Sequence, residues 1–269
     1  GVVKSASIQV QVRQLTAAEK KRQANQYLFL KALVTKGAVY QGEPLVVTYK
    51  LYTRVNINEY NFDKNPELNG FWNKEFEIKE NNRKTETING LQWTSFVLKK
   101  TLLYPQKSGR LKIDPMKMNF VIEKPSNRRR SFFDRPEQLN IIASSDPIRI
   151  NVKALPKGAP ASFTGAVGQF KLSSKVSKNE LKANDGVDYS ITLSGKGNLQ
   201  LLPKPKLDFP QDFEVYDPKI DNKYSVKLSG TSGKKVFNYL VIPRFGGDFT
   251  LKPFEFSYFN PKTKKYVTL

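Results

Sequence analysis

The sequence predicts an all-β chain of tandem β-sandwich domains, from three observations: alternating apolar side chains, closely spaced turn signals and an internal repeat. Apolar and polar residues alternate over short stretches rich in β-branched and aromatic residues, which is typical of strands with one buried face. The clearest stretches are residues 45–52, 96–104, 189–193 and 254–259. We expect eight of their side chains in the core: Phe96, Leu98, Tyr189, Ile191, Leu193, Phe254, Phe256 and Tyr258.

Turn signals separate these stretches. Asn89-Gly90, Asp185-Gly186 and Gly246-Gly247 favour tight turns between strands. Residues 195–198 are also predicted as a tight turn, because the proline at position 203 prevents the helix that a phosphate-binding loop requires. Short strands at this spacing favour sandwiches over a fold that alternates strands and helices.

The repeat relates two segments that lie 138 positions apart. Each contains an apolar run ending in proline, a glycine turn, alternating apolar residues and a second proline. The first copy is Leu102-Leu103-Tyr104-Pro105, Gly109, Leu111, Ile113 and Pro115; the second is Leu240-Val241-Ile242-Pro243, Gly247, Phe249, Leu251 and Pro253. A strand pair that recurs at one domain length predicts two copies of one module. We therefore predict two immunoglobulin-like β-sandwiches, over residues 27–153 and 163–269.

The ends of the modules follow from a second similarity. Residues 5–12 share the spacing of Ser, Ile and Val with residues 145–152, which close the first module. We interpret residues 1–12 as the closing strand of a preceding, truncated module and expect the second module to lack its final strand, so that the chain is a fragment of a longer array. Residues 13–26 are predicted to be a solvated linker with at most one helical turn, after a capping box at Thr16 and Glu19. Residues 154–162 are a second linker by composition.

Composition restricts the chemistry. The 269 residues include no cysteine and no histidine, which excludes cysteine nucleophiles and Ser-His-Asp triads and argues against structural zinc. We expect no enzymatic activity, no cofactor and no metal. The chain carries 45 Lys and Arg against 24 Asp and Glu, a net charge of +21. We interpret this charge mainly as lysines on solvated surfaces that keep the protein soluble. Attraction of anionic partners is the second interpretation. Nucleic acid is not expected, since no nucleic-acid-binding motif is present.

Two groups of residues are candidates for binding a partner. Phe71 and Trp72 follow a glycine in a polar stretch, residues 56–73, that is predicted to be irregular. They are either anchors for a partner or a plug that closes one end of the sandwich. The second group is Arg128, Arg129, Arg130, Phe132 and Phe133, which form a basic insertion in a hairpin, at residues 124–136. This loop either grips an acidic protein partner or has no binding role.

Several motifs together resemble the BatD family of bacterial aerotolerance proteins. They are Val39-Tyr40-Gln41-Gly42-Glu43-Pro44, Gly70-Phe71-Trp72, Leu103-Tyr104-Pro105, residues 163–170, Gly195-Lys196-Gly197-Asn198-Leu199, Val215-Tyr216-Asp217-Pro218-Lys219 and residues 256–261. The resemblance implies a periplasmic protein with tandem immunoglobulin-like modules, anchored to the inner membrane by a span near the C-terminus of the full-length protein. No apolar run in this sequence is long enough for such a span, and its start does not resemble a signal peptide. The resemblance also implies partners among von Willebrand A-domain and TPR proteins, and it supplies no catalytic residues.

These observations predict a non-catalytic protein–protein interaction scaffold of the bacterial envelope. The alternative is a β-sandwich module that binds a carbohydrate or an anionic ligand. A surface groove lined by exposed Trp or Tyr would favour that alternative.

Overall fold

The computed structural model describes residues 13–78, 82–123 and 137–269. Within these residues there is one α-helix, α1 (Ala17–Ala24), and one 3-10 turn, Leu199–Leu201. The first eleven strands form an N-terminal unit: β1 (Leu28–Val34), β2 (Ala38–Tyr40), β3 (Leu45–Thr53), β4 (Ile57–Lys64), β5 (Phe71–Phe76), β6 (Lys84–Ile88), β7 (Leu91–Pro105), β8 (Gly109–Ile113), β9 (Lys117–Glu123), β10 (Gln138–Ser144) and β11 (Ile148–Lys153). The others form a C-terminal unit: β12 (Phe163–Val176), β13 (Val187–Gly197), β14 (Phe213–Val215), β15 (Lys219–Lys227), β16 (Gly230–Pro243), β17 (Ser257–Asn260) and β18 (Lys265–Thr268).

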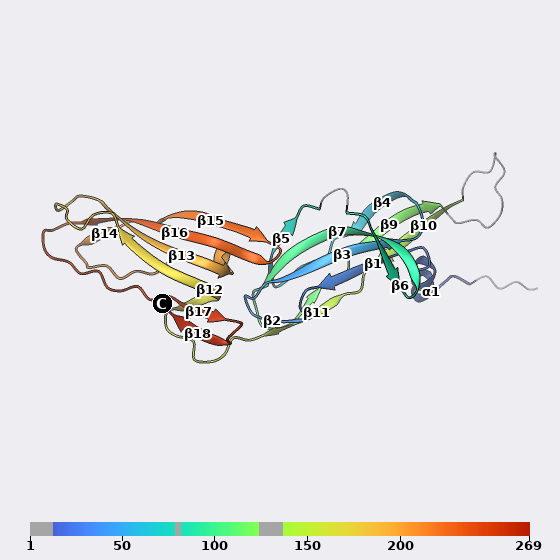
Figure 1. The fold of residues 1–269 in the computed structure, drawn as a ribbon, viewed down its shortest axis with the longest axis horizontal. Coiled ribbons are helices and arrows are strands. Elements are labelled where there is room, and N and C mark those ends of the chain that lie inside the picture. Colours follow the sequence, from blue (N-terminus) through green and yellow to red (C-terminus); the bar gives the residue numbers. More distant parts are fainter. Residues whose placement is uncertain (1–12, 79–81, 124–136) are drawn as a thin grey trace, which may run out of the picture.

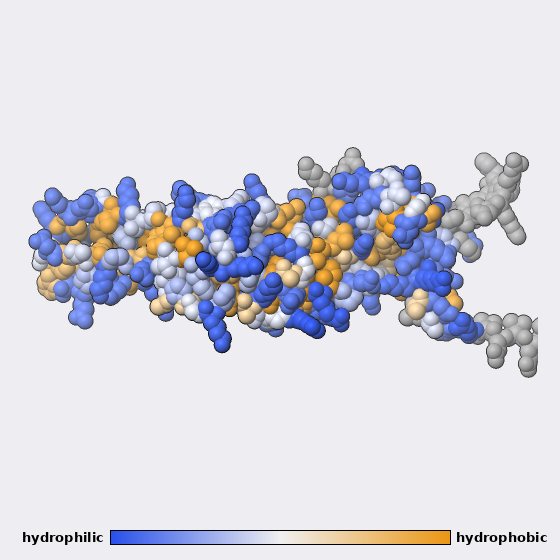
Figure 2. Space-filling model, turned by 60° about the horizontal axis from the view of Figure 1, so that its bottom comes forward, coloured by the Kyte–Doolittle hydropathy of each residue, from blue (hydrophilic) through white to orange (hydrophobic). Residues whose placement is uncertain are grey.

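The prediction of an all-β chain is confirmed. The immunoglobulin-like topology and the domain bounds stay predictions. The two units lie end to end, so that the molecule is elongated, with α1 at one end and β14 at the other (Figure 1). Hydrophilic residues cover most of the face shown in Figure 2, and apolar patches interrupt them.

The N-terminal unit packs one sheet against two smaller ones. Its larger sheet has the order β1-β3-β7-β5, with β6 also paired to β7. Opposite lie the sheets β10-β9-β4 and β2-β11-β8, in which β2 runs parallel to β11. Alternation along β3 sends Leu45, Val47, Tyr49 and Leu51 into the core between these layers. Burial of such side chains stabilises a domain by about 25 cal/mol per Å² of apolar surface.

The C-terminal unit is built around a strand that changes partner. The first residues of β12 pair in parallel with β17, and from Gly168 onward β12 pairs with β13. The change of partner lets the β17–β18 hairpin fold over the inner face of β13 and β16. A second, separate core lies there, with Ile191, Phe237, Phe256 and Tyr258 among its buried side chains.

The eight side chains expected in the core all pack there. Tyr189, Ile191, Leu193, Phe256 and Tyr258 are buried. The others are partly buried and pack against the cores: Phe96, Leu98 and Phe254.

Some local predictions are corrected by the structure. The stretch 56–73 is not irregular throughout, because β4 occupies much of it. Gly195 and Gly197 do not form a tight turn; they are the last residues of β13 and pair with β12. A side chain at Gly195 would lie 2.1 Å from the carbonyl oxygen of Gln169, so the glycines allow two backbones to approach.

Residues 13–26 contain more structure than a solvated linker with one helical turn. The Thr16–Glu19 capping box forms, as the sequence indicated, but α1 extends over eight residues. Ala24 at its end is buried in the N-terminal core, and the Lys21 ammonium lies 2.7 Å from the Asp146 carboxylate. The buried Ala24 and the Lys21–Asp146 ion pair together dock the helix on the N-terminal unit. The strand predicted at residues 5–12 lies outside the described residues.

Candidate partner-binding groove

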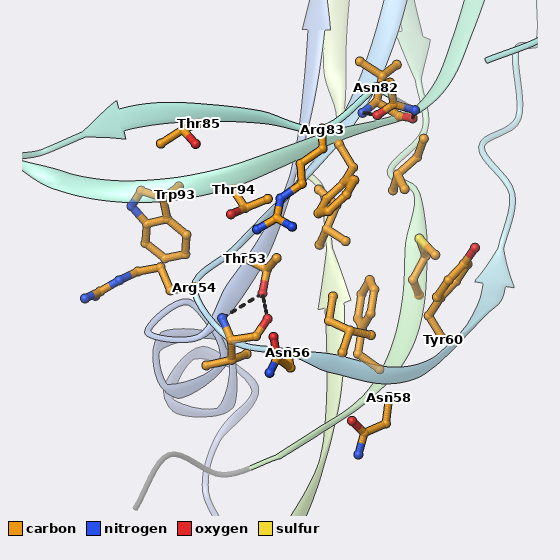
Figure 3. Close-up of a pocket in the computed structure, with 18 of the residues that line it drawn as sticks. Thr53, Arg54, Asn56, Asn58, Tyr60, Asn82, Arg83, Thr85, Trp93 and Thr94 are labelled. Atoms are coloured by element: carbon orange, nitrogen blue, oxygen red, sulfur yellow. Dashed lines mark hydrogen bonds between the residues drawn. The ribbon is translucent and has the colours of Figure 1, made fainter. Parts of the chain in front are cut away.

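The inner face of β4 is partly uncovered. β4 pairs with β9 and is otherwise an open edge of its sheet. Tyr60 and Phe62 lie opposite Phe120 and Met118 of β9 and, together with Asn58, line a groove of the N-terminal unit. Figure 3 shows Asn58 and Tyr60 in this groove. Tyr60 is 63% exposed and Phe62 is 48% exposed. Aromatic side chains at this level of exposure on an open edge are typical of surfaces that another molecule covers.

The floor of the groove is the edge of the hydrophobic core. Phe96 and Leu98 of β7 face Met118 and Phe120 of β9 across it. The Tyr60 and Phe120 ring centroids are 6.5 Å apart, so Tyr60 continues the core outward. The cavity measures about 900 Å³, which is within the size range of ligand sites.

Cationic and amide groups form the rim. Arg54 follows β3, Arg83 precedes β6, and Arg83 extends toward Thr94 in the close-up (Figure 3). Among the described residues that line the groove, Arg54 and Arg83 are the charged ones, and no carboxylate accompanies them. The local field therefore favours a neutral or anionic occupant.

Hydrogen bonds fix the backbone of this rim. The Thr53 hydroxyl donates to the Val55 carbonyl at 2.8 Å and accepts from the Val55 N–H at 3.1 Å, which closes the turn after β3 (Figure 3). The Asn82 side chain bonds both the N–H and the C=O of Val97, at 2.9 and 3.1 Å. In this way Asn82 takes the place of a neighbouring strand next to β7.

Trp93 supports the rim from beneath rather than facing a ligand. It is 5% exposed, and its ring packs edge-on against Phe29 with centroids 4.8 Å apart. The Arg54 guanidinium lies 5.6 Å from the Trp93 ring centroid, a cation–π contact that holds Arg54 at the groove.

A carboxylate on the other face of β6 holds that strand in place. Glu86 accepts hydrogen bonds from Lys50 (2.7 Å), Ser95 (2.6 Å) and Tyr52 (3.1 Å), which lie on β3 and β7. The hydrogen bond from Lys50, followed by that from Ser95, lowers the pKa of Glu86 to about 2. Glu86 is thus an ionised structural group that ties β6 to the sheet beside the groove.

The structure places Phe71 and Trp72, two of the predicted partner-binding residues, away from this groove. Phe71 begins β5 and is buried in the N-terminal core, and Trp72 packs edge-on against Tyr104, with ring centroids 5.7 Å apart. Both positions favour packing within the protein over the alternative, which was contact with a partner. Residues Arg128, Arg129, Arg130, Phe132 and Phe133 lie outside the described part of the chain.

The groove residues Tyr60 and Phe62 were not predicted from the sequence. A signal was present, because aromatic residues alternate with polar ones at positions 59–63. The surrounding asparagines and the proline at position 66 obscured that pattern.

In the described ranges, no group of three or more Asp, Glu, His or Cys could hold a metal ion. Nor is any helix among those residues long and apolar enough to cross a membrane.

Comparison with protein families gives a match to a family model. The model of the BatD family, described as a BatD DUF11-like domain, matches residues 32–152 and 174–269, which is most of the chain. The chain belongs to the BatD family. The resemblance found in the sequence motifs is thereby confirmed. A comparison with curated proteins found no match.

Motifs that carry the BatD resemblance meet where the two units join. Tyr104 of β7 is fully buried there, beside Val46 and Leu102 on the outer face of the larger sheet. Its hydroxyl donates to the Gly197 carbonyl at 3.0 Å and accepts from the Thr231 N–H at 2.8 Å. Both partners belong to the C-terminal unit, and burial raises the pKa of Tyr104, so that the hydroxyl keeps its proton.

The segment before β3 contributes the other side of this joint. A side chain at Gly42 would come within 2.9 Å of Val167, and Pro44 lies beside Gly230. The Asn198 side chain accepts from the Val167 N–H and donates to the Gly165 carbonyl, both at 2.8 Å. The Asn198 bonds order the C-terminal side of the joint, while the close approach of Gly42 to the Val167 side chain and the buried hydrogen bonds of Tyr104 hold the two units of this BatD-family protein at a set angle.

Proposed function

We propose that the protein is a non-catalytic protein–protein interaction scaffold of the bacterial envelope and that the groove beside β4 holds a partner protein. The observation that carries the proposal is the exposure of Tyr60 and Phe62 on the inner face of an open edge strand. Aromatic side chains supply much of the binding energy at protein interfaces, and an open edge offers unpaired backbone groups to an incoming strand.

The charge of the groove specifies the partner surface further. Arg54 and Arg83 stand at the rim without a lining carboxylate among the described residues. We expect an apolar segment that also carries an acidic side chain. Membership of the BatD family supports a periplasmic location, and the family resemblance supports von Willebrand A-domain and TPR proteins as the partners.

The test measures binding of purified von Willebrand A-domain and TPR proteins from the same gene neighbourhood. Replacement of Tyr60 and Phe62 by serine should weaken the Kd about tenfold or more, as loss of an interface hot spot does. The matched control is Ile142→Ser on β10, which is 69% exposed and does not line the groove. Unchanged affinity in the groove variant, for every partner that the unaltered protein binds, would contradict the proposal.

Binding of a carbohydrate in the same groove is the second candidate. The exposed ring of Tyr60 and the amides of Asn56 and Asn58 line the same groove, and sugar rings bind through stacking combined with hydrogen bonds. Titration with peptidoglycan fragments tests this candidate. Saturable binding that Tyr60→Ala abolishes would favour it, and absence of binding to any fragment would exclude it for this envelope polymer.

A further inference from the structure

The larger sheet of the N-terminal unit carries a group of lysines on its outer face. Near the joint this face is covered, since Val46 and Leu102 pack there with Leu201 of the C-terminal unit. Further from the joint, the register of the sheet places four lysines on the same face: Lys31 on β1, Lys50 on β3, Lys84 on β6 and Lys100 on β7. Glu86 of β6 shares this face with them.

Three of these lysines line one hollow, which measures about 280 Å³ and lies over β3, β6 and β7. They are Lys50, Lys84 and Lys100, and no carboxylate accompanies them in the described lining. Thr35 and Thr48 add hydroxyl groups. The Thr35 hydroxyl accepts a backbone N–H of β3 at 3.0 Å, which leaves its own proton to bond an anion. The hollow therefore offers both ammonium and hydroxyl donors to an anionic group.

The described residues balance only part of this charge. Glu86 accepts from Lys50 at 2.7 Å, whereas Lys84 and Lys100 make no ion pair within the described part of the chain. Lys31 stands directly opposite Lys50 in the β1–β3 register, and like charges in such a position destabilise a sheet. The segments outside the described residues contain more cations than carboxylates, in a chain of net charge +21. An anion from another molecule would relieve this repulsion.

The residue types and the size of the hollow favour a phosphate group over a carboxylate. Arginine matches a planar carboxylate with its fork of donors, whereas lysine acts as a point charge. The described lining contains lysine without arginine. A phosphate monoester carries a charge of about −1.5 to −2, which matches Lys84 and Lys100, the two lysines without a carboxylate. The hollow is also much smaller than the groove of about 900 Å³ beside β4, so it suits a small group better than a protein segment.

We propose that this hollow binds a phosphate group, held by Lys84 and Lys100 with the Thr35 hydroxyl as a further donor. The ligand class is a phosphate monoester, either free in solution or on the headgroup of a lipid. The site is separate from the groove of the proposed scaffold, because successive side chains at the start of β6 line different surfaces. Arg83 lines the groove beside β4, and Lys84 lines the hollow. Loss of one site would leave the other in place.

Two probes test the site and distinguish the sources of phosphate. Inorganic phosphate is titrated into the full chain at constant ionic strength, and backbone amide NMR signals of β3, β6 and β7 should shift to saturation. Vesicles of phosphatidylcholine, with and without phosphatidic acid, are tested by sedimentation. Binding of free phosphate alone identifies a soluble ligand, and sedimentation that requires phosphatidic acid identifies a lipid headgroup. Absence of saturable binding to either probe overturns the proposal.

A matched pair of variants separates the site from general attraction by the net charge. Lys84→Gln with Lys100→Gln should weaken the Kd about tenfold or more, because two charge-assisted contacts are lost. The control is Lys171→Gln with Lys175→Gln on β12, which removes the same charge from two exposed positions that line none of the described grooves. The control should keep its affinity within about twofold, and an equal loss in both variants overturns the proposal.

The Tm without a probe checks that the affected variant still folds. It should be unchanged, since Lys84 and Lys100 make no ion pair with a described residue. If it falls, Lys84→Gln alone takes the place of the double variant, because Lys84 is exposed on its strand. Unchanged affinity in that single variant also overturns the proposal.

Discussion

The Tyr104 hydroxyl shows how a single buried group links the two units. Its aromatic ring continues the outer face of β7, and its hydroxyl satisfies the Thr231 N–H and the Gly197 carbonyl, on strands of the other unit. Both Tyr104 and Thr231 are fully buried, so water does not replace a lost partner. A buried donor or acceptor without a partner costs about 1–3 kcal/mol.

Tyr104→Phe should therefore lower the free energy of unfolding by about 1–3 kcal/mol, although the ring and its packing are kept. Urea denaturation followed by tryptophan fluorescence measures the change, because Trp72 contacts the Tyr104 ring. Tyr258→Phe is the matched control. The Tyr258 side chain is also buried, but its hydroxyl makes no hydrogen bond among the described residues. If the two variants lose the same stability, the hydroxyl of Tyr104 has no special part in the joint.

At the scale of elements, β6 depends on the cluster around Glu86. The strand is short, and Lys50, Tyr52 and Ser95 bond its one central carboxylate. The pKa of Glu86 is lowered from an ordinary value of 4.5 to about 2 in the folded protein. Because the folded pKa is depressed, the stabilisation is complete above about pH 4.5 and is lost as the pH falls toward 2.

Glu86→Gln should thus flatten the pH dependence of stability between about pH 5 and pH 2.5, relative to the unaltered protein. Other carboxylates titrate in the same window, so the difference between the two proteins is the quantity to measure. Thermal unfolding at several pH values supplies it. Parallel pH profiles would show that Glu86 is not held by its three neighbours.

The sequence predicted some elements better than others, for physical reasons. β3, β7 and β13 were predicted because a long alternation of apolar and polar residues, rich in β-branched and aromatic side chains, is typical of a strand with one buried face. β4 was missed because most of its side chains are exposed, and an open edge strand needs few buried residues. The same openness creates the groove, so the feature that hid the strand also produced the candidate site. Gly195 was predicted as a turn since sequence alone does not show which backbone approaches a glycine.

At the scale of the whole molecule, the joint between the units is marked in the sequence by continuous apolar runs, which differ from the alternating pattern of strands with one buried face. Val46, between Leu45 and Val47, and the run Leu102-Leu103-Tyr104 place apolar residues on both faces of their strands. Strands that are buried on both faces give such continuous runs. One face of these strands packs in the N-terminal core, and the other packs against Leu201 and Val226 of the C-terminal unit.

The set angle between the units depends on Gly42, and this dependence can be tested with a matched pair of variants. Gly42 and Gly90 have the same φ of +77°, so a leucine at either position strains the backbone equally. Only Gly42 lies against the other unit, where a Cβ would approach Val167 to 2.9 Å; no atom lies within 4 Å of a Cβ at Gly90. Gly42→Leu should separate the units, so that small-angle X-ray scattering reports a broader range of shapes and denaturation splits into two steps. Gly90→Leu should lose stability without either change, and a Gly42→Leu variant with the scattering profile of the unaltered protein would show that the joint is not what fixes the angle.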